Sequence, residues 1–220
     1  AFCNAGDLEG VGRDMTKIYL VRHGQTEWNV GGRFQGHSDV ELAETGIRQA
    51  ECLAEHFPAE KIDAIYSSDL QRAVSTAEFL AERFGCEVQK TENLREMNFG
   101  AWEGLTFEQI VEKWPEAGEQ IFSAPDELKP PGGETFQDVE ERAARTLEKI
   151  TSEHEGKRII LVAHGAFLRT ILTYALHMPL RYVWRLRQGN TAVSRLTHGG
   201  HHFTVDYVNS IAHLEHLKGA

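Results

Sequence analysis

No apolar run in this sequence approaches the roughly 20 residues that a transmembrane helix needs. Positive charge is also in short supply: 23 Lys and Arg residues stand against 33 Asp and Glu residues, and the formal net charge is −10 at pH 7. Such an acidic balance argues against general binding to nucleic acid or to an anionic membrane. An anionic ligand would therefore need a local cluster of cations.

Cysteine is scarce: Cys3, Cys52 and Cys86 lie far apart, and there is no C-x-x-C pair. An odd number of widely spaced cysteines predicts reduced, mostly buried thiols in the cytoplasm and argues against disulfides or a zinc site. Histidine is plentiful, with eleven residues, and is densest in "HGGHH" at 198–202. That stretch lacks zinc-ligand spacing and lies between two strand-like runs, so we expect a polar turn and no bound metal.

Segments with strand-like and helix-like periodicity alternate along the chain. The expected strands are 17–22, 64–68, 88–93 and 158–164, the expected helices are 42–57, 69–85, 135–154 and 166–178, and 192–198 with 203–209 are typical of a β-hairpin. Asp69 is expected to cap its helix and Gly85 to end it, while Ile47 belongs to the apolar stripe of the first helix. This alternation predicts an α/β fold, a three-layer sandwich with a mostly parallel central sheet and helices on both faces.

We expect residues 15–220 to form a single domain. Residues 1–14 are small and polar, lack the basic and apolar regions of a signal peptide, and are interpreted as a flexible leader or a remnant of expression. The alternation breaks between about 105 and 133, where Pro and Gly punctuate a partly helical segment. An excursion of this length inside a compact domain indicates a lid or binding segment, so we interpret it as a helical lid insertion.

Three of the expected strands end in unusual polar groups. These are Arg22-His23-Gly24 after the first strand, Ser67-Ser68 with Arg72 in the following helix after the second, and His164-Gly165 after the fourth. Ligands of open α/β sheets bind beyond the carboxyl ends of the strands. If these strands are neighbours, two arginines and two imidazoles converge on a pocket suited to a tetrahedral oxyanion such as phosphate. The glycine after each histidine leaves no Cβ to block a close approach.

Each of these residues also has an ordinary structural reading. A lone histidine at a strand end is usually a satisfied polar residue, and Arg72 alone would usually be a surface residue of a helix. The joint pattern favours a site, because cations at three strand ends repel one another without an anion.

Several motifs resemble those of the histidine phosphatase superfamily, the phosphoglycerate-mutase-like proteins. They are "LVRHGQTEWN", "SSDLQRAVSTAEFL", "LREMNFGAWEG", "PPGGETFQDVEERA" and "ILVAHGAFLRTIL", which occur in the expected order. The resemblance as a whole runs from about residue 17 to residue 208. The resemblance implies a phosphoryl-transfer enzyme that works through a phosphohistidine.

The resemblance also implies a role for individual positions. His23 matches the nucleophile, and Glu96 matches the proton donor, which lies near two other acids, Glu92 and Glu103. The residues that match holders of the phosphoryl oxygens are Arg22, Arg72 and His164, and those that match the loop closing over the phosphate are Asn29, Gln35 and Gly36. Gly165 and Phe99 are further candidates for contact with the substrate. Neither a metal nor a cofactor is required, because the arginines supply the electrostatic stabilisation.

Departures from the mutase pattern favour a phosphatase, that is, a metal-independent phosphomonoesterase acting on small phosphate esters. Mutases usually carry a tyrosine where this chain has Phe99, a leucine-glutamine pair where it has Trp102-Glu103, and an asparagine where it has Ala166. Residues 105–133 also offer six acids, two lysines and no arginine for a second anionic group. "FGAWEG" and "PPGGET" resemble the branch with broad-specificity and α-ribazole phosphatases. A bisphosphoglycerate-dependent mutase and a non-catalytic phospholigand-binding module are the alternatives, and substrate and oligomeric state stay open.

Overall fold

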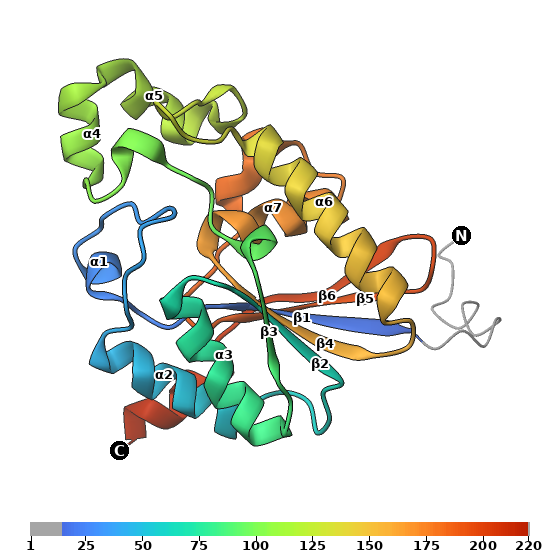
Figure 1. Cartoon of the computed structure of the whole chain (residues 1–220). Helices are drawn as coiled ribbons and strands as arrows, with labels where there is room; N and C mark the ends of the chain where they lie inside the picture. The colour runs from blue at the N-terminus through green and yellow to red at the C-terminus, as the bar shows by residue number, and fades with distance from the viewer. Residues whose placement is uncertain (1–14, 220) are drawn as a thin grey trace.

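A six-stranded sheet forms the centre of the computed structural model, which describes residues 15–219 (Figure 1). The leader predicted for residues 1–14 lies outside the described residues. The strands are β1 (Thr16–Arg22), β2 (Ala64–Ser68), β3 (Val88–Thr91), β4 (Arg158–Ala163), β5 (Val193–His198) and β6 (Phe203–Ser210), in the order β3-β2-β4-β1-β5-β6. The first four in this order pair in parallel, and β5 and β6 form the predicted hairpin, antiparallel to β1. The mostly parallel sheet is confirmed.

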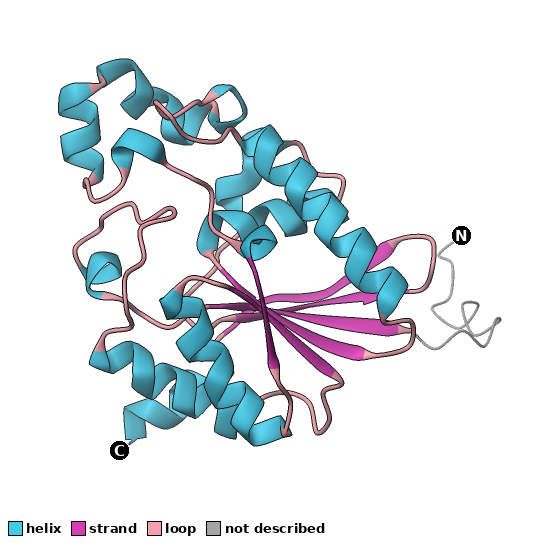
Figure 2. Cartoon of the chain, viewed as in Figure 1, coloured by secondary structure: helices cyan, strands magenta, loops and turns pink. Residues whose placement is uncertain are grey.

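Helices cover both faces of the sheet, as predicted (Figure 2). The α-helices are α1 (Glu27–Val30), α2 (Glu44–Glu55), α3 (Gln71–Phe84), α4 (Phe107–Lys113), α5 (Pro115–Ser123), α6 (Phe136–Glu153) and α7 (Gly165–Ala175), and short 3-10 segments include η1 (Glu92–Leu94), η2 (Gly100–Trp102), η3 (Pro125–Glu127), η4 (Leu180–Arg185) and η5 (Ala212–Gly219). In Figure 1, α2 and α3 lie below the sheet, while α6 and α7 lie above it. Among the described residues, no helix has the length and hydropathy needed to cross a bilayer.

Strand β1 shows why the sheet is buried on both faces. Ile18 and Leu20 pack into the core that includes residues of α6 and α7, whereas Tyr19 and Val21 pack into the core that includes residues of α2 and α3. Side chains alternate across a strand, so an uninterrupted apolar run feeds two cores at once. The carboxyl ends of the parallel strands are therefore held in place between two packed layers.

Two local predictions were wrong. Asp69 does not cap α3: its carboxylate accepts hydrogen bonds from Arg95, and Asp39 Oδ1 instead accepts from the Gln71 N–H at 2.7 Å. The guanidinium of Arg95 competes for the carboxylate that the helix would otherwise use. Ile47 is 40% exposed, because α2 turns Gly46 toward the loop after β1, where a Cβ would lie 2.0 Å from the Gln25 carbonyl oxygen. Gly85 ends α3 with a φ of 64°, as predicted.

The insertion at 105–133 contains α4, α5 and η3. A capping box between Thr106 and Gln109 starts α4, and Pro115 occupies the first turn of α5. Ile110 and Ile121 are fully buried in the core that includes residues of α6 and α7, whereas Phe122 is 61% exposed. The insertion therefore has a buried anchor and an exposed apolar surface, and its role as a lid stays a prediction.

Candidate active site

The three strands with polar ends are neighbours in the sheet, in the order β2-β4-β1. This arrangement brings His23 and His164 together, with ring centroids 5.1 Å apart. The charges of Arg22 and Arg72 act on both imidazoles. The predicted convergence of these four side chains is what the structure shows.

His23 is buried and held in one orientation. Its Nδ1 lies 2.7 Å from the carbonyl oxygen of Gly24, which can only accept, so Nδ1 carries the proton and Nε2 is left with a free lone pair. Its backbone N–H donates to the Ala163 carbonyl on β4 at 3.0 Å. Burial, followed by the nearby guanidinium groups of Arg72 and Arg22, holds the pKa of His23 well below its usual value. A neutral, oriented imidazole with an available nitrogen is suited to nucleophilic attack.

His164 stands directly before α7 and is fully buried. In the described part of the chain, neither of its ring nitrogens has a hydrogen-bond partner. Its pKa is also well below the usual value, because of burial and then the charge of Arg72. A buried imidazole without partners is costly in a protein that binds nothing at this place, and it can hydrogen-bond an oxygen of a bound anion.

Arg72 reaches the pocket from the first turn of α3. It is fully buried, and its two Nη atoms donate to the carbonyl oxygens of Ser38 at 2.7 Å and Gly36 at 2.8 Å. Burial lowers its pKa to about 10, so the group stays cationic at neutral pH. Its Nε, which is buried, has no partner among the described residues.

Arg22 and Arg169 approach the pocket from β1 and α7. Arg22 donates to the Gln188 carbonyl oxygen at 2.7 Å, and Arg169 donates from Nε to the Leu186 carbonyl oxygen at 2.7 Å. Burial, followed by the charge of Arg169, lowers the pKa of Arg22 to about 10. None of the three arginines forms an ion pair within the described residues. The charge of Glu96 acts on all three arginines, but no carboxylate among the described residues lies within ion-pair distance of them. Three cations near a single buried carboxylate leave an excess of positive charge, which indicates a site for an external anion.

Glu96 is almost fully buried, and its side chain lies beside the amino end of α7. Its Oε1 accepts hydrogen bonds from the N–H groups of Met97 and Phe167, both at 2.9 Å, and its Oε2 accepts from the Ala166 N–H at 3.0 Å. The amino end of an eleven-residue helix supplies two of these donors and a favourable dipole. The same helix therefore places His164, Arg169 and the Glu96 carboxyl around one point.

The loop after β1 carries two of the predicted phosphate contacts. The side-chain oxygen of Asn29 accepts from the backbone N–H of Thr26 at 3.1 Å, and from the amide nitrogen of Asn190 at 3.2 Å. The side-chain oxygen of Gln35 accepts from the Thr26 hydroxyl at 3.1 Å. Since both amide oxygens are held, both NH₂ groups are the ends left to donate to an anion.

Two glycines allow side chains of the site to pack closely against the backbone. A Cβ on Gly165 would lie 3.0 Å from an Nη atom of Arg169 and 3.4 Å from Arg22 Nε. Gly36 has a φ of +53°, and a Cβ there would lie 2.0 Å from Glu103 Oε1. Phe99, the remaining candidate, is buried edge-on against Phe34, with ring centroids 5.0 Å apart. Its contact with substrate stays a prediction.

Sequence reasoning missed two residues that shape the site. Arg169 has a signal in the sequence, because it is the single charge in the otherwise apolar helix that follows His164. Glu103 gave none, since it is one acid among several. Its carboxylate accepts from the backbone N–H groups of His37 at 2.9 Å and Ser38 at 2.8 Å, and so fixes the loop whose carbonyls bind Arg72. No group of three or more candidate metal ligands occurs among the described residues.

Comparison with known proteins agrees with this geometry. The family description "Histidine phosphatase superfamily (branch 1)" matches residues 18–211. The chain belongs to this superfamily. It is 42% identical to the metal-independent phosphoserine phosphatase of Arabidopsis thaliana over 161 residues, which cover 72% of this chain and 68% of the relative. It is 36% identical to phosphoglycerate mutase-like protein 4 of the same plant, with 92% of this chain and 88% of the relative covered.

A solved relative has the same fold. The structure of a phosphoserine phosphatase variant from Entamoeba histolytica in complex with phosphoserine superposes with a TM-score of 0.82 at 33% identity, covering 90% of this chain and 99% of that one. The α/β architecture expected for the superfamily therefore extends over nearly the whole described chain.

Proposed function

We propose that this member of the superfamily is a metal-independent phosphomonoesterase that forms a phosphohistidine at His23. The observation that carries the proposal is a neutral, oriented His23 among arginines that form no ion pair with the described residues. The names of the phosphatase relatives support it.

In the first half-reaction, His23 Nε2 attacks phosphorus, an N–P bond forms, and the bond from phosphorus to the ester oxygen breaks. Arg22, Arg72 and His164 hold the equatorial oxygens and stabilise their charge. Glu96, carrying a proton, gives it to the departing alkoxide, which is a poor leaving group at neutral pH. Oε2 is the oxygen we assign to this transfer, because it accepts one backbone hydrogen bond and Oε1 accepts two.

In the second half-reaction, water attacks the phosphohistidine and Glu96, now a carboxylate, takes its proton. The N–P bond breaks, inorganic phosphate leaves, and His23 returns to its neutral form. No step needs a metal ion, because guanidinium groups provide the positive charge. Asn29 and Gln35 are proposed to donate from their NH₂ groups to the phosphoryl oxygens.

Small phosphorylated hydroxy acids are the proposed substrates, with phosphoserine as the first to test. Two relatives are named for phosphoserine, and Arg169 places a third cation beside Arg22, where a substrate carboxylate could be neutralised. The insertion at 105–133 is proposed to cover the ester group as a lid. We place the protein in the cytoplasm, because Cys52 and Cys86 are free thiols.

The proposal is tested by turnover with chelator present. Phosphoserine, α-ribazole phosphate and p-nitrophenyl phosphate are compared with conversion of 3-phosphoglycerate in the presence of 2,3-bisphosphoglycerate. Release of inorganic phosphate that the chelator does not affect, and that His23→Ala abolishes, is expected. Strong mutase flux with little hydrolysis would favour the mutase alternative, and binding without turnover would favour a phospholigand-binding module.

A further inference from the structure

Two peptide groups follow the proposed nucleophile His23, and each of them is held at both ends. The carbonyl oxygen of the first, that of His23, accepts a hydrogen bond from the side-chain amide of Asn190 at 3.1 Å. The N–H of the same peptide, that of Gly24, donates to the Thr76 hydroxyl at 3.0 Å. A peptide group is planar, so contacts at both ends fix its orientation. The first peptide is therefore tied both to α3 and to the segment before β5.

The second peptide controls the orientation of the imidazole. Its carbonyl oxygen, that of Gly24, lies 2.7 Å from His23 Nδ1 and is the one hydrogen-bond partner of this ring among the described residues. At the other end of the same planar group, the N–H of Gln25 donates to Oε1 of Gln49 at 3.0 Å. A rotation of this peptide would turn its oxygen away from the ring. Gln49, which lies on α2 and outside the predicted catalytic set, thus fixes the direction in which Nδ1 donates.

The sequence of α2 brings Gln49 to this place. Gly46 lies three residues before Gln49, on the same side of the helix, and a Cβ on Gly46 would collide with the backbone of Gln25. The glycine therefore lets the loop after β1 pack directly on the helix backbone. The Ala43 N–H donates to the Gln25 carbonyl oxygen at 2.9 Å, and Leu53 anchors α2 in the core that it shares with α3. A packed helix consequently holds the Gln49 amide against the loop.

The contact with Gln49 also strengthens the hydrogen bond to the imidazole. An N–H that donates to an acceptor polarises its peptide group, and the polarised carbonyl is a better acceptor for the proton on His23 Nδ1. This hydrogen bond keeps the tautomer in which Nε2 carries the lone pair. Because no carboxylate bonds to His23 Nδ1 within the described residues, the peptide takes the place that an acidic side chain has beside the histidine of a catalytic triad.

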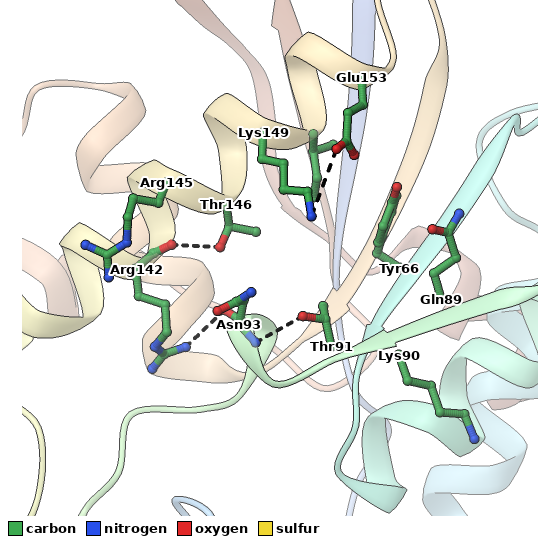
Figure 3. Close-up of a pocket in the computed structure, with 11 residues that line it drawn as sticks. Tyr66, Gln89, Lys90, Thr91, Asn93, Arg142, Arg145, Thr146, Lys149 and Glu153 are labelled. Atoms are coloured by element: carbon green, nitrogen blue, oxygen red, sulfur yellow. Dashed lines mark hydrogen bonds and ion pairs between the residues drawn. The ribbon is translucent and has the colours of Figure 1, made fainter.

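The backbone of the proposed acid is also held by a residue outside the predicted catalytic set. Arg142 lines a groove between α6 and the edge of the sheet (Figure 3). Its guanidinium donates to the carbonyl oxygens of Asn93, Arg95 and Glu96, at 3.1, 2.8 and 3.3 Å. Both reacting side chains are therefore positioned through the backbone by residues outside the set named from the sequence.

We propose that Gln49 is a positioning residue for the nucleophile, and that it acts through the Gly24–Gln25 peptide to hold the His23 imidazole in the orientation needed for attack by Nε2. This inference rests on the proposed function, because it takes His23 as the group that attacks phosphorus. The ordinary alternative is that Gln49 only satisfies a backbone N–H group and stabilises the loop. The two roles differ in what loss of the side-chain oxygen does to the imidazole.

Kinetics of the first turnover test the effect on attack. Gln49→Met replaces the amide by a thioether, a weak acceptor, at the same chain length, and Gln49→Leu removes the acceptor altogether. We expect either change to lower the first-turnover rate with p-nitrophenyl phosphate by about 10- to 100-fold, because a misplaced nucleophile loses the advantage of orientation. Inhibition by inorganic phosphate should be unchanged, since the side chains that hold the anion are intact. Gln49→Glu keeps an acceptor oxygen and should restore most of the rate, and the exposed change Glu51→Leu on α2 is the matched control.

Nitrogen-15 NMR of the histidine rings tests the geometry without catalysis, with the His23 signals assigned by their loss in His23→Ala. The wild type and Gln49→Glu should show the tautomer with the proton on Nδ1, and Gln49→Met should show a mixture of both tautomers. A wild type without phosphatase activity would refute the proposed function, while this change in tautomer would still support the positioning role. A Gln49→Met protein that keeps the wild-type spectrum and first-turnover rate and loses only stability would overturn the proposal, as would a Gln49→Glu protein as slow as Gln49→Met.

Discussion

Charged side chains at the amino ends of the parallel strands differ in burial and pairing from the arginines at the carboxyl ends. At the amino ends, Lys61 lies 3.0 Å from the carboxylate of Asp63, with its side chain 71% exposed, and the Arg158 N–H donates to the same carboxylate at 2.9 Å. At the carboxyl ends, Arg72 is fully buried, and neither it nor Arg22 forms an ion pair within the described residues. The charges at the amino ends are exposed to water and paired, whereas the pocket at the carboxyl ends holds two buried arginines that form no ion pair with the described residues.

This difference separates structural charge from functional charge. An exposed ion pair contributes little to the free energy of folding, and its partners can be exchanged. A buried cation with only carbonyl partners costs free energy of desolvation, which a bound anion offsets. The predictions below test whether the carboxyl ends are a catalytic anion site and the amino ends are not.

Replacing His23 should have the largest effect. His23→Ala is expected to lower kcat for phosphoserine by about 10⁴-fold or more, because the variant lacks the proposed nucleophile. Lys61→Gln at the amino ends should leave activity unchanged. Steady-state phosphate release measures the activity of both variants, and circular dichroism checks that they are folded. A folded His23→Ala protein that keeps substantial activity would contradict the assignment of the catalytic site to the carboxyl ends of the strands.

Removing the acid should give an effect that depends on the leaving group. Glu96→Gln is expected to lower turnover of phosphoserine by about 10²–10⁴-fold, and the release of p-nitrophenol in a first turnover much less. The amide keeps the size of the carboxyl but cannot donate the required proton. Pre-steady-state measurements with the two substrates check the ratio; an equal loss for both would assign Glu96 a structural role.

A charge-conserving change at the buried arginine sharpens the comparison. Arg72→Lys is expected to lower kcat/KM by about 10²-fold, since an ammonium cannot reproduce the planar contacts of a guanidinium. The matched change Arg158→Lys, at the exposed start of β4, should have no effect on kinetics. If both variants kept full activity, charge geometry at the carboxyl ends would not matter for the reaction.

Gly36→Ala tests the loop that holds Arg72. At a φ of +53°, an alanine is strained, and its Cβ would displace the Glu103 carboxylate that fixes His37 and Ser38. We expect a loss of about 1–3 kcal/mol in the free energy of unfolding, together with reduced activity. Urea denaturation is the measurement, with Gly32→Ala as a control, because that glycine has a similar φ of +62° but no atoms within 4 Å of its Cβ position.

The last prediction concerns acid stability, and the change that tests it should have no effect on activity at neutral pH. His213 is buried against Thr191, and burial lowers its pKa to about 4, whereas in the unfolded chain it titrates near 6.5. The unfolded state binds more protons between these values, so stability should fall as pH drops through this range, by up to about 1.4 kcal/mol per pH unit for this group. His213→Asn should show a shallower fall in urea titrations between pH 6.5 and 4, and an unchanged slope would contradict this assignment.

Residues at strand ends were predictable because an apolar run that stops at a charged residue is a local signal. Strand-helix alternation predicts a parallel sheet but does not say which strands are neighbours, so the grouping of Arg22, His23, Arg72 and His164 depended on the order β2-β4-β1 that the structure shows. Contacts made over long sequence separations were not predictable. The carboxylate of Asp69 binds Arg95, 26 residues later in the chain, and so does not cap α3. The carboxylate of Glu103 accepts a hydrogen bond from Ser38, 65 residues earlier. Neither contact produces a periodic pattern in the sequence from which it could be predicted.

The most direct test of the central claim is to trap the phosphoenzyme. Glu96→Gln should accept phosphate from p-nitrophenyl phosphate but hydrolyse the intermediate slowly, because no carboxylate activates the water. Intact-mass and peptide mass spectrometry with chelator present should then find one phosphoryl group on His23, and none when His23→Ala is added to the same variant. A phosphoryl group on another residue, or turnover by the wild type with no covalent phosphate in either protein, would contradict the account.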